Sequence, residues 1–344
     1  MPQTDSLFHG VSFDPAATTV RRFGFEQLDR ELEDQNVFSW IDIESPDIER
    51  LNEVLRRWQI DLLLVNRFNE PEVLPRIVER PDCLAFYLYE VIDPERHLDT
   101  SHGLSPIRFE RMILVLGKDF VITYHQRPLD AVDYVKATCE ENFQLAGKTP
   151  GFIAFLFLQR CLYDYAHLNL ANDNFLDMLH GGVDGKTFRP ELETAADLAG
   201  RNILTLKKLA VSLHIILVVL VTKRNRFVSE AARGSFAEML QTSVSMRASI
   251  DSSRDMLDGI LRGMQTAAAN RTSEIARVLT LVSAIILPLS LIAGIYGMNF
   301  EFMPELRHPW GYFLTLILMA LVAVWLVVFF RRLGWLGRPA QRQR

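Results

Sequence analysis

The tripeptide Gly297-Met298-Asn299 stands at the end of an apolar run, residues 278–296, where a generic connection would need only polar residues. A helix that ends there leaves its last backbone carbonyls unsatisfied, and Asn299 adds an amide oxygen. Neutral oxygens suit a hard cation such as Mg²⁺, which sheds its waters reluctantly and can be held through its hydration shell. Two acids in the following loop, Glu301 and Glu305, would raise the local cation concentration. An ordinary helix cap with solvated acids is the alternative.

Small and hydroxyl-bearing side chains recur along this run and its approach at steps of three and four residues. They form one stripe with a period of about 3.5, called here the small-residue stripe. Its members are Ser273, Ala276, Thr280, Ser283, Leu287, Ser290, Gly294 and Gly297, of which Leu287 is the one large apolar side chain. The stripe is typical of a close-packed seam between membrane helices, or of a pore lining when several copies surround one axis. In a pore, Leu287 would form a hydrophobic constriction. The opposite faces carry apolar side chains suited to lipid or to neighbouring helices: Val278, Leu281, Ile285, Leu289 and Ile292.

Two segments near the C-terminus are long enough to span a bilayer. Residues 278–296 and 311–330 are each about 20 residues of uncharged sequence, enough for a hydrocarbon core of roughly 30 Å. Arg271 and Arg277 precede the first segment, and Arg331 and Arg332 follow the second. The positive-inside rule therefore places both termini in the cytoplasm and the connecting loop outside the cell. We therefore expect a multi-pass protein of the cell (inner) membrane. A third apolar run, 209–221, is about 13 residues long and predicts a buried core helix, with His214 as a satisfied core side chain.

The remainder of the chain predicts a cytosolic α/β domain. Residues 37–43, 83–92, 109–117 and 119–125 are rich in aromatic and β-branched side chains and predict strands of a mixed sheet covered by helices. Helical patterns follow at 129–146, 150–179 and from about 191 to 233, with Gly234 as an expected break. Three widely spaced cysteines indicate free thiols in a reducing compartment. The expected division is a tail 1–22, an α/β domain 23–148, a helical hairpin 149–233, a stalk helix 234–277, a first span 278–299, an outer loop 300–310, a second span 311–330 and a basic tail 331–344.

The stretch YGMNFEFMPEL, residues 296–306, resembles the signature of the CorA family of magnesium channels, in which Gly-Met-Asn ends the first of two C-terminal spans. The resemblance extends to ILPLSLIAGIYGMNF around Pro288, to NRTSEIARVLT (270–280) and to FVITYH (120–125), and so covers nearly the whole chain. It implies a membrane homopentamer whose first spans line one pore beneath a cytosolic funnel of α/β domains. It also implies that Gly297, Met298 and Asn299 select hydrated Mg²⁺.

The resemblance assigns further positions. Leu287 and Ser290 match the hydrophobic constriction and the polar ring beside it, and Leu279 matches a second gating position one residue off the stripe. Ser273 stands where the family often has asparagine. Glu238 lies near a stalk position that senses cytosolic Mg²⁺, with a solvated glutamate as the alternative. The basic tail with Arg331 and Arg332 resembles a basic ring at the cytosolic pore end, or serves as positive-inside anchoring and lipid contact.

These features predict passive Mg²⁺ influx, with Co²⁺ and Ni²⁺ as surrogate ions. A zinc transporter of the related ZntB type is the alternative, although zinc prefers imidazole and thiolate ligands and the outer mouth offers only His308. A two-span sensor without transport would leave the small-residue stripe unexplained. An enzyme is not expected, because the sequence contains no P-loop, nucleophile elbow or HExxH motif, so we expect neither ATP nor an organic cofactor. A net charge of −5 gives no support for nucleic acid as a partner.

Overall fold

The computed structural model describes residues 7–34, 36–57, 60, 65, 68–69, 77–94, 104–145, 149–182, 190–222, 227–298 and 308–335. The chain divides into two compact units. The first comprises Met1–Gly182 and Arg189–Leu261, and the second Val183–Phe188 and Arg262–Arg344. Helix α7 (Glu230–Tyr296) contributes residues to both.

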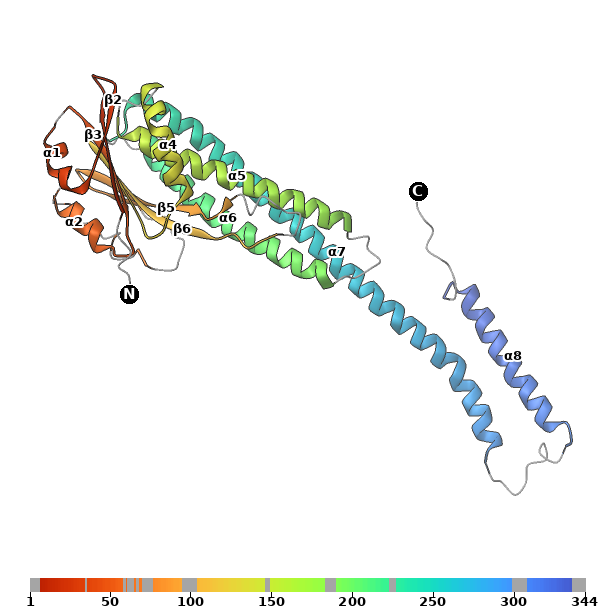
Figure 1. The fold of residues 1–344 in the computed structure, drawn as a ribbon. Coiled ribbons are helices and arrows are strands. Elements are labelled where there is room, and N and C mark those ends of the chain that lie inside the picture. The colour runs from red at the N-terminus through yellow and green to blue at the C-terminus, as the bar shows by residue number, and fades with distance from the viewer. Residues whose placement is uncertain are drawn as a thin grey trace. The chain divides into compact units, whose positions relative to one another are not determined.

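The first unit is built on a seven-stranded sheet with the order β2-β1-β3-β7-β6-β5-β4 (Figure 1). Its strands are β1 Leu7–Asp14, β2 Thr19–Phe23, β3 Phe38–Glu44, β4 Ile77–Glu79, β5 Cys83–Val91, β6 Phe109–Gly117 and β7 Phe120–His125. The pairing of β3 with β7 is parallel and the other pairings are antiparallel, so the predicted mixed sheet is confirmed. Every residue of β5 and β7 is buried, as expected for central strands covered on both faces.

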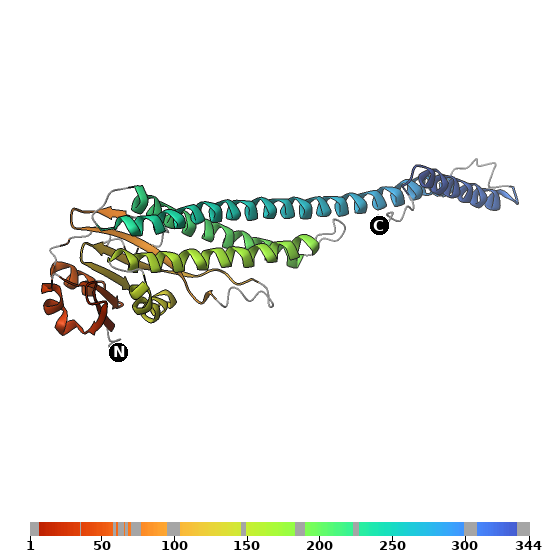
Figure 2. The ribbon, with the colours of Figure 1, turned by 90° about the horizontal axis from the view of Figure 1, so that it is seen from above.

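Helices cover both faces of this sheet (Figure 1). Their bounds are α1 Leu28–Glu33, α2 Glu49–Arg57, α4 Asp130–Leu145, α5 Gly151–Gly182 and α6 Pro190–Thr222. Alternation along β3 sends the Trp40 ring against Phe157 of α5, while α2 buries Leu51 and Val54. Figure 2 shows α5, α6 and the first part of α7 running side by side. Side-chain bonds join these helices, including Asn169 to Ser249 at 3.0 Å.

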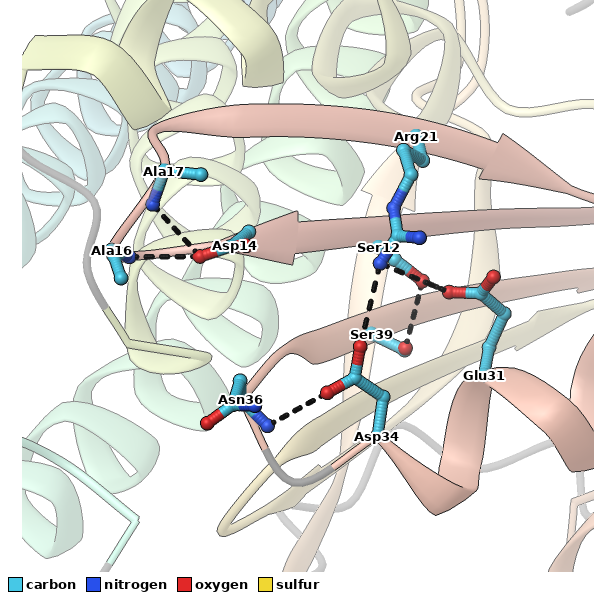
Figure 3. A network of polar contacts seen from close by, with 9 residues as sticks. All are labelled: Ser12, Asp14, Ala16, Ala17, Arg21, Glu31, Asp34, Asn36 and Ser39. Atoms are coloured by element: carbon cyan, nitrogen blue, oxygen red, sulfur yellow. Dashed lines mark hydrogen bonds and ion pairs between the residues drawn. The ribbon is translucent and has the colours of Figure 1, made fainter.

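The expectation of a loosely held tail over residues 1–22 is wrong for the described part. Strand β1 pairs with β3 from Leu7 to Phe13 and buries Val11 and Phe13. The adjoining polar network ties the β1–β2 hairpin to the rest of the unit (Figure 3): the Ser12 hydroxyl donates to Glu31 at 2.7 Å, and Arg21 pairs with Asp34 at 3.5 Å. The hairpin is therefore an integral edge of the sheet.

The helical part differs from expectation at one junction. Helix α6 ends at Thr222, not near 233, and α7 begins at Glu230, so Gly234 lies inside a helix and does not break it. Glycine in an exposed helix costs about 1 kcal/mol, which packing elsewhere along α7 outweighs.

Three helices are apolar and long enough to cross a membrane, namely Leu192–Thr222, Ala232–Tyr296 and Gly311–Arg332, the last being α8. Half of the most apolar window of α6 is buried inside the protein, against 6% in α7 and 0% in α8. The run 209–221 is thus a core helix, as predicted. His214 is satisfied there, because its Nδ1 lies 2.9 Å from the Ser243 hydroxyl. The three cysteines are free and buried.

Candidate functional site

The C-terminal end of α7 is a tight turn. The Gly297 N–H donates to the Ala293 carbonyl at 3.0 Å, and the Met298 N–H donates to the Ile295 carbonyl at 3.3 Å. A Cβ at position 297 would lie 3.2 Å from the Ala293 oxygen, a close approach that favours glycine. The Met298 side chain is half exposed. Asn299, Glu301 and Glu305 fall outside the described residues, so their predicted roles stay predictions.

The small-residue stripe lies wholly on the exposed surface of α7. All eight of its members, from Ser273 to Gly297, are exposed in the single chain, and Leu287 is 73% exposed. Leu279, one residue off the stripe, is 67% exposed. The Thr280 hydroxyl donates to the Ala276 carbonyl at 2.8 Å, so the helix itself satisfies this polar group.

A different face of α7 is partly covered. Leu281 is buried, and the half-buried positions after it are Ala284, Ile285, Pro288, Leu289, Ile292 and Tyr296. On α8 the half-buried positions also follow helical spacing: Gly311, Thr315, Met319, Val322, Ala323, Leu326 and Phe330. Figure 1 shows α8 beside the last turns of α7, within the second unit. At roughly 3.6 residues per turn, the covered face of α7 is opposite the small-residue stripe. The stripe is therefore not the covered face of α7 in the single chain, and it remains available for other contacts.

Glu238 lies in a groove of about 370 Å³ between α5 and α7 of the first unit. Gln159, Tyr163 and His167 line it from α5, with the Tyr163 and His167 rings 3.8 Å apart between centroids. Among the described residues, no group of three or more His, Cys, Asp or Glu side chains is placed to hold a metal ion. Glu238 would thus need ligands from elsewhere to bind a cation.

The C-terminal end of α8 is positively charged. Arg331 and Arg332 occupy the last turn of α8 and are exposed, where positive charge interacts favourably with the helix dipole. Tryptophan and tyrosine cluster at the opposite end of α8, at Trp310 and Tyr312, as at a membrane interface.

The family model described as CorA-like Mg2+ transporter protein matches residues 35–332 of this chain. The chain belongs to the CorA family. The resemblance noted in the sequence is thereby confirmed, and the match runs from the α/β domain through both apolar C-terminal helices. The family's description as a transporter also agrees with the expectation that the chain is not an enzyme.

Individual CorA relatives support this placement. A cobalt/magnesium transport protein CorA from Thermotoga maritima is 30% identical over 68% of this chain and 67% of its own length. The CorA magnesium transporter of Methanocaldococcus jannaschii shares the fold with a TM-score of 0.77 at 18% identity, covering 95% of this chain and 98% of that one. The ZntB cytoplasmic domain from Vibrio parahaemolyticus matches with a TM-score of 0.52 at 11% identity, covering 77% of this chain and 99% of that one.

Sequence reasoning missed one buried polar centre of this CorA-family chain, in the α/β domain. Asp42 of β3 accepts a hydrogen bond from the Thr123 hydroxyl at 2.6 Å, lies 3.2 Å from His125 Nε2, and pairs with Lys136 of α4 at 2.8 Å. Burial opposes charge on Asp42, but the His125 and Lys136 partners lower its pKa overall. Burial likewise opposes charge on His125, yet the bond to Asp42 raises the pKa of that imidazole. The sequence did contain one indication of this centre. Asp42 lies on the same strand face as Trp40, in a segment whose other residues are typical of a buried strand.

Proposed function

We propose that this chain is a Mg²⁺ channel that carries passive, electrochemically driven influx across the cell membrane, with Co²⁺ and Ni²⁺ as surrogate ions. The observation that carries the proposal is the small-residue stripe, which is exposed on α7 opposite the half-buried face of that helix and ends at Gly297. Copies of α7 arranged around an axis would place the stripe on a shared pore. One hairpin cannot enclose such a pore, so the proposal requires an oligomer, and the family resemblance points to a homopentamer.

Within this pore, Gly297, Met298 and Asn299 form the outer selectivity site for hydrated Mg²⁺, and Glu301 with Glu305 gathers cations at the rim. Leu287 forms the hydrophobic constriction, and Leu279 forms a second constriction toward the cytosol. The Ser283 hydroxyl lies between these two rings, and the Ser290 hydroxyl lies beside Leu287 on the side of Gly297. No charged residue lies within 278–296 or 311–330, which supports passive flux over a carboxylate proton relay. Both termini are cytosolic, and Arg331 and Arg332 end α8 at the cytosolic face.

Regulation by cytosolic Mg²⁺ is assigned to Glu238. Its groove supplies one carboxylate beside Tyr163 and His167, which is too few ligands for Mg²⁺, so the remaining oxygens come from a neighbouring copy. Mg²⁺ bound between copies would hold the stalks of α7 together and favour the closed constriction at Leu287.

Ion uptake in a cell strain that lacks its own magnesium transporters tests the proposal. The wild-type protein should restore Mg²⁺ uptake, and Asn299→Ala should abolish most of it. Asn36→Ala, the same change in an exposed loop of the α/β domain, should behave as wild type. Unchanged Mg²⁺ uptake in Asn299→Ala would sink the selectivity assignment.

The zinc alternative is separated by the same assay. Zinc sites in proteins are built from imidazole and thiolate, and His308 near the outer end of α8 already accepts a hydrogen bond from the Trp310 N–H at its Nδ1, 3.3 Å away. Zn²⁺ flux that follows an imposed proton gradient, with no Mg²⁺ flux, would establish the ZntB-type function instead.

A further inference from the structure

The C-terminal end of α8 is closed by a specific reversal of the chain. Gly334 has a φ of +75°, a left-handed conformation that favours glycine. Its N–H donates to the Arg331 carbonyl at 3.1 Å, and the Trp335 N–H donates to the Phe330 carbonyl at 2.9 Å. This pair of bonds is the Schellman motif, which brings the residue after the glycine back onto the last turn of the helix. The Trp335 ring accordingly stacks on Phe330, with centroids 5.8 Å apart.

A second aromatic pair precedes the first on the same helix. Trp325 stacks on Phe329 with centroids 5.5 Å apart and ring planes 16° from parallel. These rings are exposed, Trp325 at 63% and Trp335 at 40%. Exposed tryptophans at the end of an apolar helix are suited to the boundary between acyl chains and headgroups, because the ring is apolar and the indole N–H needs a polar partner.

The same end of α8 is uniformly basic. From His308 to Arg344 the sequence contains no aspartate or glutamate, and its arginines are Arg331, Arg332, Arg338, Arg342 and Arg344. Among the residues that the structure describes, none of the ion pairs includes Arg331 or Arg332. Two exposed guanidinium groups therefore lie next to two aromatic stacks with no carboxylate to neutralise them.

We propose that this end of α8 binds the headgroup of an anionic phospholipid in the cytosolic leaflet. Arg331 and Arg332 contact the lipid phosphate, and the stacks that end in Phe329 and Trp335 hold the glycerol and upper acyl region. Charge complementarity selects the partner, since guanidinium is the preferred donor to phosphate oxygens and this end of the chain offers no acid to compete. The orientation of α8 rests on the proposed function, which places this end in the cytosol.

Because the lipid site uses both arginines, it is an alternative to the basic pore ring that the family resemblance implies for Arg331 and Arg332. The test must therefore measure lipid binding and not ion flux.

The full-length protein is reconstituted in nanodiscs of phosphatidylcholine, and binding of fluorescent phosphatidylglycerol is titrated. We expect saturable binding by the wild type, weakened about 30-fold in the double variant Arg331→Gln/Arg332→Gln, since each arginine near an anionic surface contributes about a fivefold effect. The matched control is Arg271→Gln/Arg277→Gln, which removes the same charge from exposed positions on α7. An equal loss of affinity for phosphatidylglycerol in the two double variants would mean that binding depends only on general positive charge, and it would contradict the proposed site.

Two further measurements separate the geometry from the charge. Gly334→Ala keeps every arginine but strains the left-handed turn that holds Trp335 on Phe330, so phosphatidylglycerol binding should weaken several-fold. Unaltered binding in Gly334→Ala would contradict a role for the folded end. Inorganic phosphate should fail to displace the lipid, and displacement at matched concentration would reassign the arginines to free phosphate. None of these measurements uses ion transport. An absence of specific lipid binding would therefore not contradict the proposed channel, and an absence of Mg²⁺ uptake would not change the interpretation of the lipid measurements.

Discussion

Replacing Asp42 by asparagine tests whether the buried polar centre of the α/β domain holds the sheet to α4. The carboxylate is 1% exposed, and both of its oxygens are engaged. Oδ1 accepts from Thr123 and lies near His125 Nε2, while Oδ2 pairs with Lys136. Asparagine preserves the shape and one acceptor but removes the charge, and its amide N–H₂ would face either the lysine or the imidazole. Lys136 would then lose its counter-charge, and the charged form of His125 would lose the partner that raises its pKa.

Removing one partner of a buried ion pair costs about 3–5 kcal/mol, a large part of the roughly 5–15 kcal/mol that stabilises a typical domain. The Lys136 side chain is 28% exposed, so water compensates part of the loss and the lower end of that range, about 3 kcal/mol, is expected. For a unit of this size, that cost lowers the midpoint of thermal unfolding by about 10 °C. The measurement is thermal unfolding of the full-length protein in detergent micelles, followed by near-UV circular dichroism.

The matched control is Asp119→Asn, which removes the same charge from an exposed pair with Lys118 at 3.8 Å and should change stability by less than about 0.5 kcal/mol. Lys136→Met should reduce the penalty of Asp42→Asn, because the two side chains share one interaction. If Asp42→Asn melts within a degree or two (about 0.5 kcal/mol) of the Asp119 variant, the polar centre does not stabilise the fold and the reasoning fails.

The remaining predictions concern pH and gating. Burial raises the pKa of Glu90 to about 8, and the side chain is 2% exposed, with Oε1 accepting the Ala131 N–H. The folded state therefore holds this proton more tightly than the unfolded state, so stability falls by on the order of 3–5 kcal/mol as pH rises from about 4.5 to 8. Glu90→Gln should flatten that decline in unfolding experiments, whereas Glu53→Gln on the surface should leave the slope as in wild type; a Glu90→Gln slope equal to wild type would refute the assignment. For gating, Leu287→Ser and Glu238→Gln should each raise Mg²⁺ influx several-fold at high cytosolic Mg²⁺, while Val282→Ser, off the small-residue stripe, should still close. Normal closure in both variants would remove Leu287 and Glu238 from the gate.

Local sequence patterns were sufficient to predict most of the helices and strands of the fold. The strands at 83–92, 109–117 and 119–125 and the helix at 129–146 agree with β5, β6, β7 and α4 to within a few residues. Their apolar periodicity is strong, and each is bounded by turn residues. The helical hairpin was also expected, although α6 ends earlier than its apolar pattern suggested.

The pairing of strands that are distant in the sequence could not be predicted from local sequence patterns. Strand β1 alternates only weakly, with Gly10 and Ser12 among its apolar residues, and it is held by pairing with β3, where Val11 lies opposite Trp40. The parallel pairing of β3 with β7 joins residues about 80 positions apart, such as Ser39 and Phe120. Strand stability of this kind comes from cross-strand neighbours, which a propensity taken from one segment cannot contain. The tail interpretation failed for that reason, and the Asp42 centre was missed for the same one.

At the candidate pore, the sequence periodicity and the burial of side chains in the structure give complementary information. Periodicity alone located the small-residue stripe but could not separate a pore lining from a close-packed seam between membrane helices, because both need small side chains. In the single chain, the face of Leu281, Ile285 and Leu289 is buried or half-buried, and Ser283, Leu287 and Ser290 are exposed on the other side. Serine and glycine gain little from contact with acyl chains, whereas large aliphatic residues gain much. A single chain in a bilayer would therefore present to lipid the face least suited to it. In the proposed channel, several copies that turn this face inward would remove the mismatch and would at the same time create a passage that ends at Gly297, so one surface would account for both assembly and ion conduction.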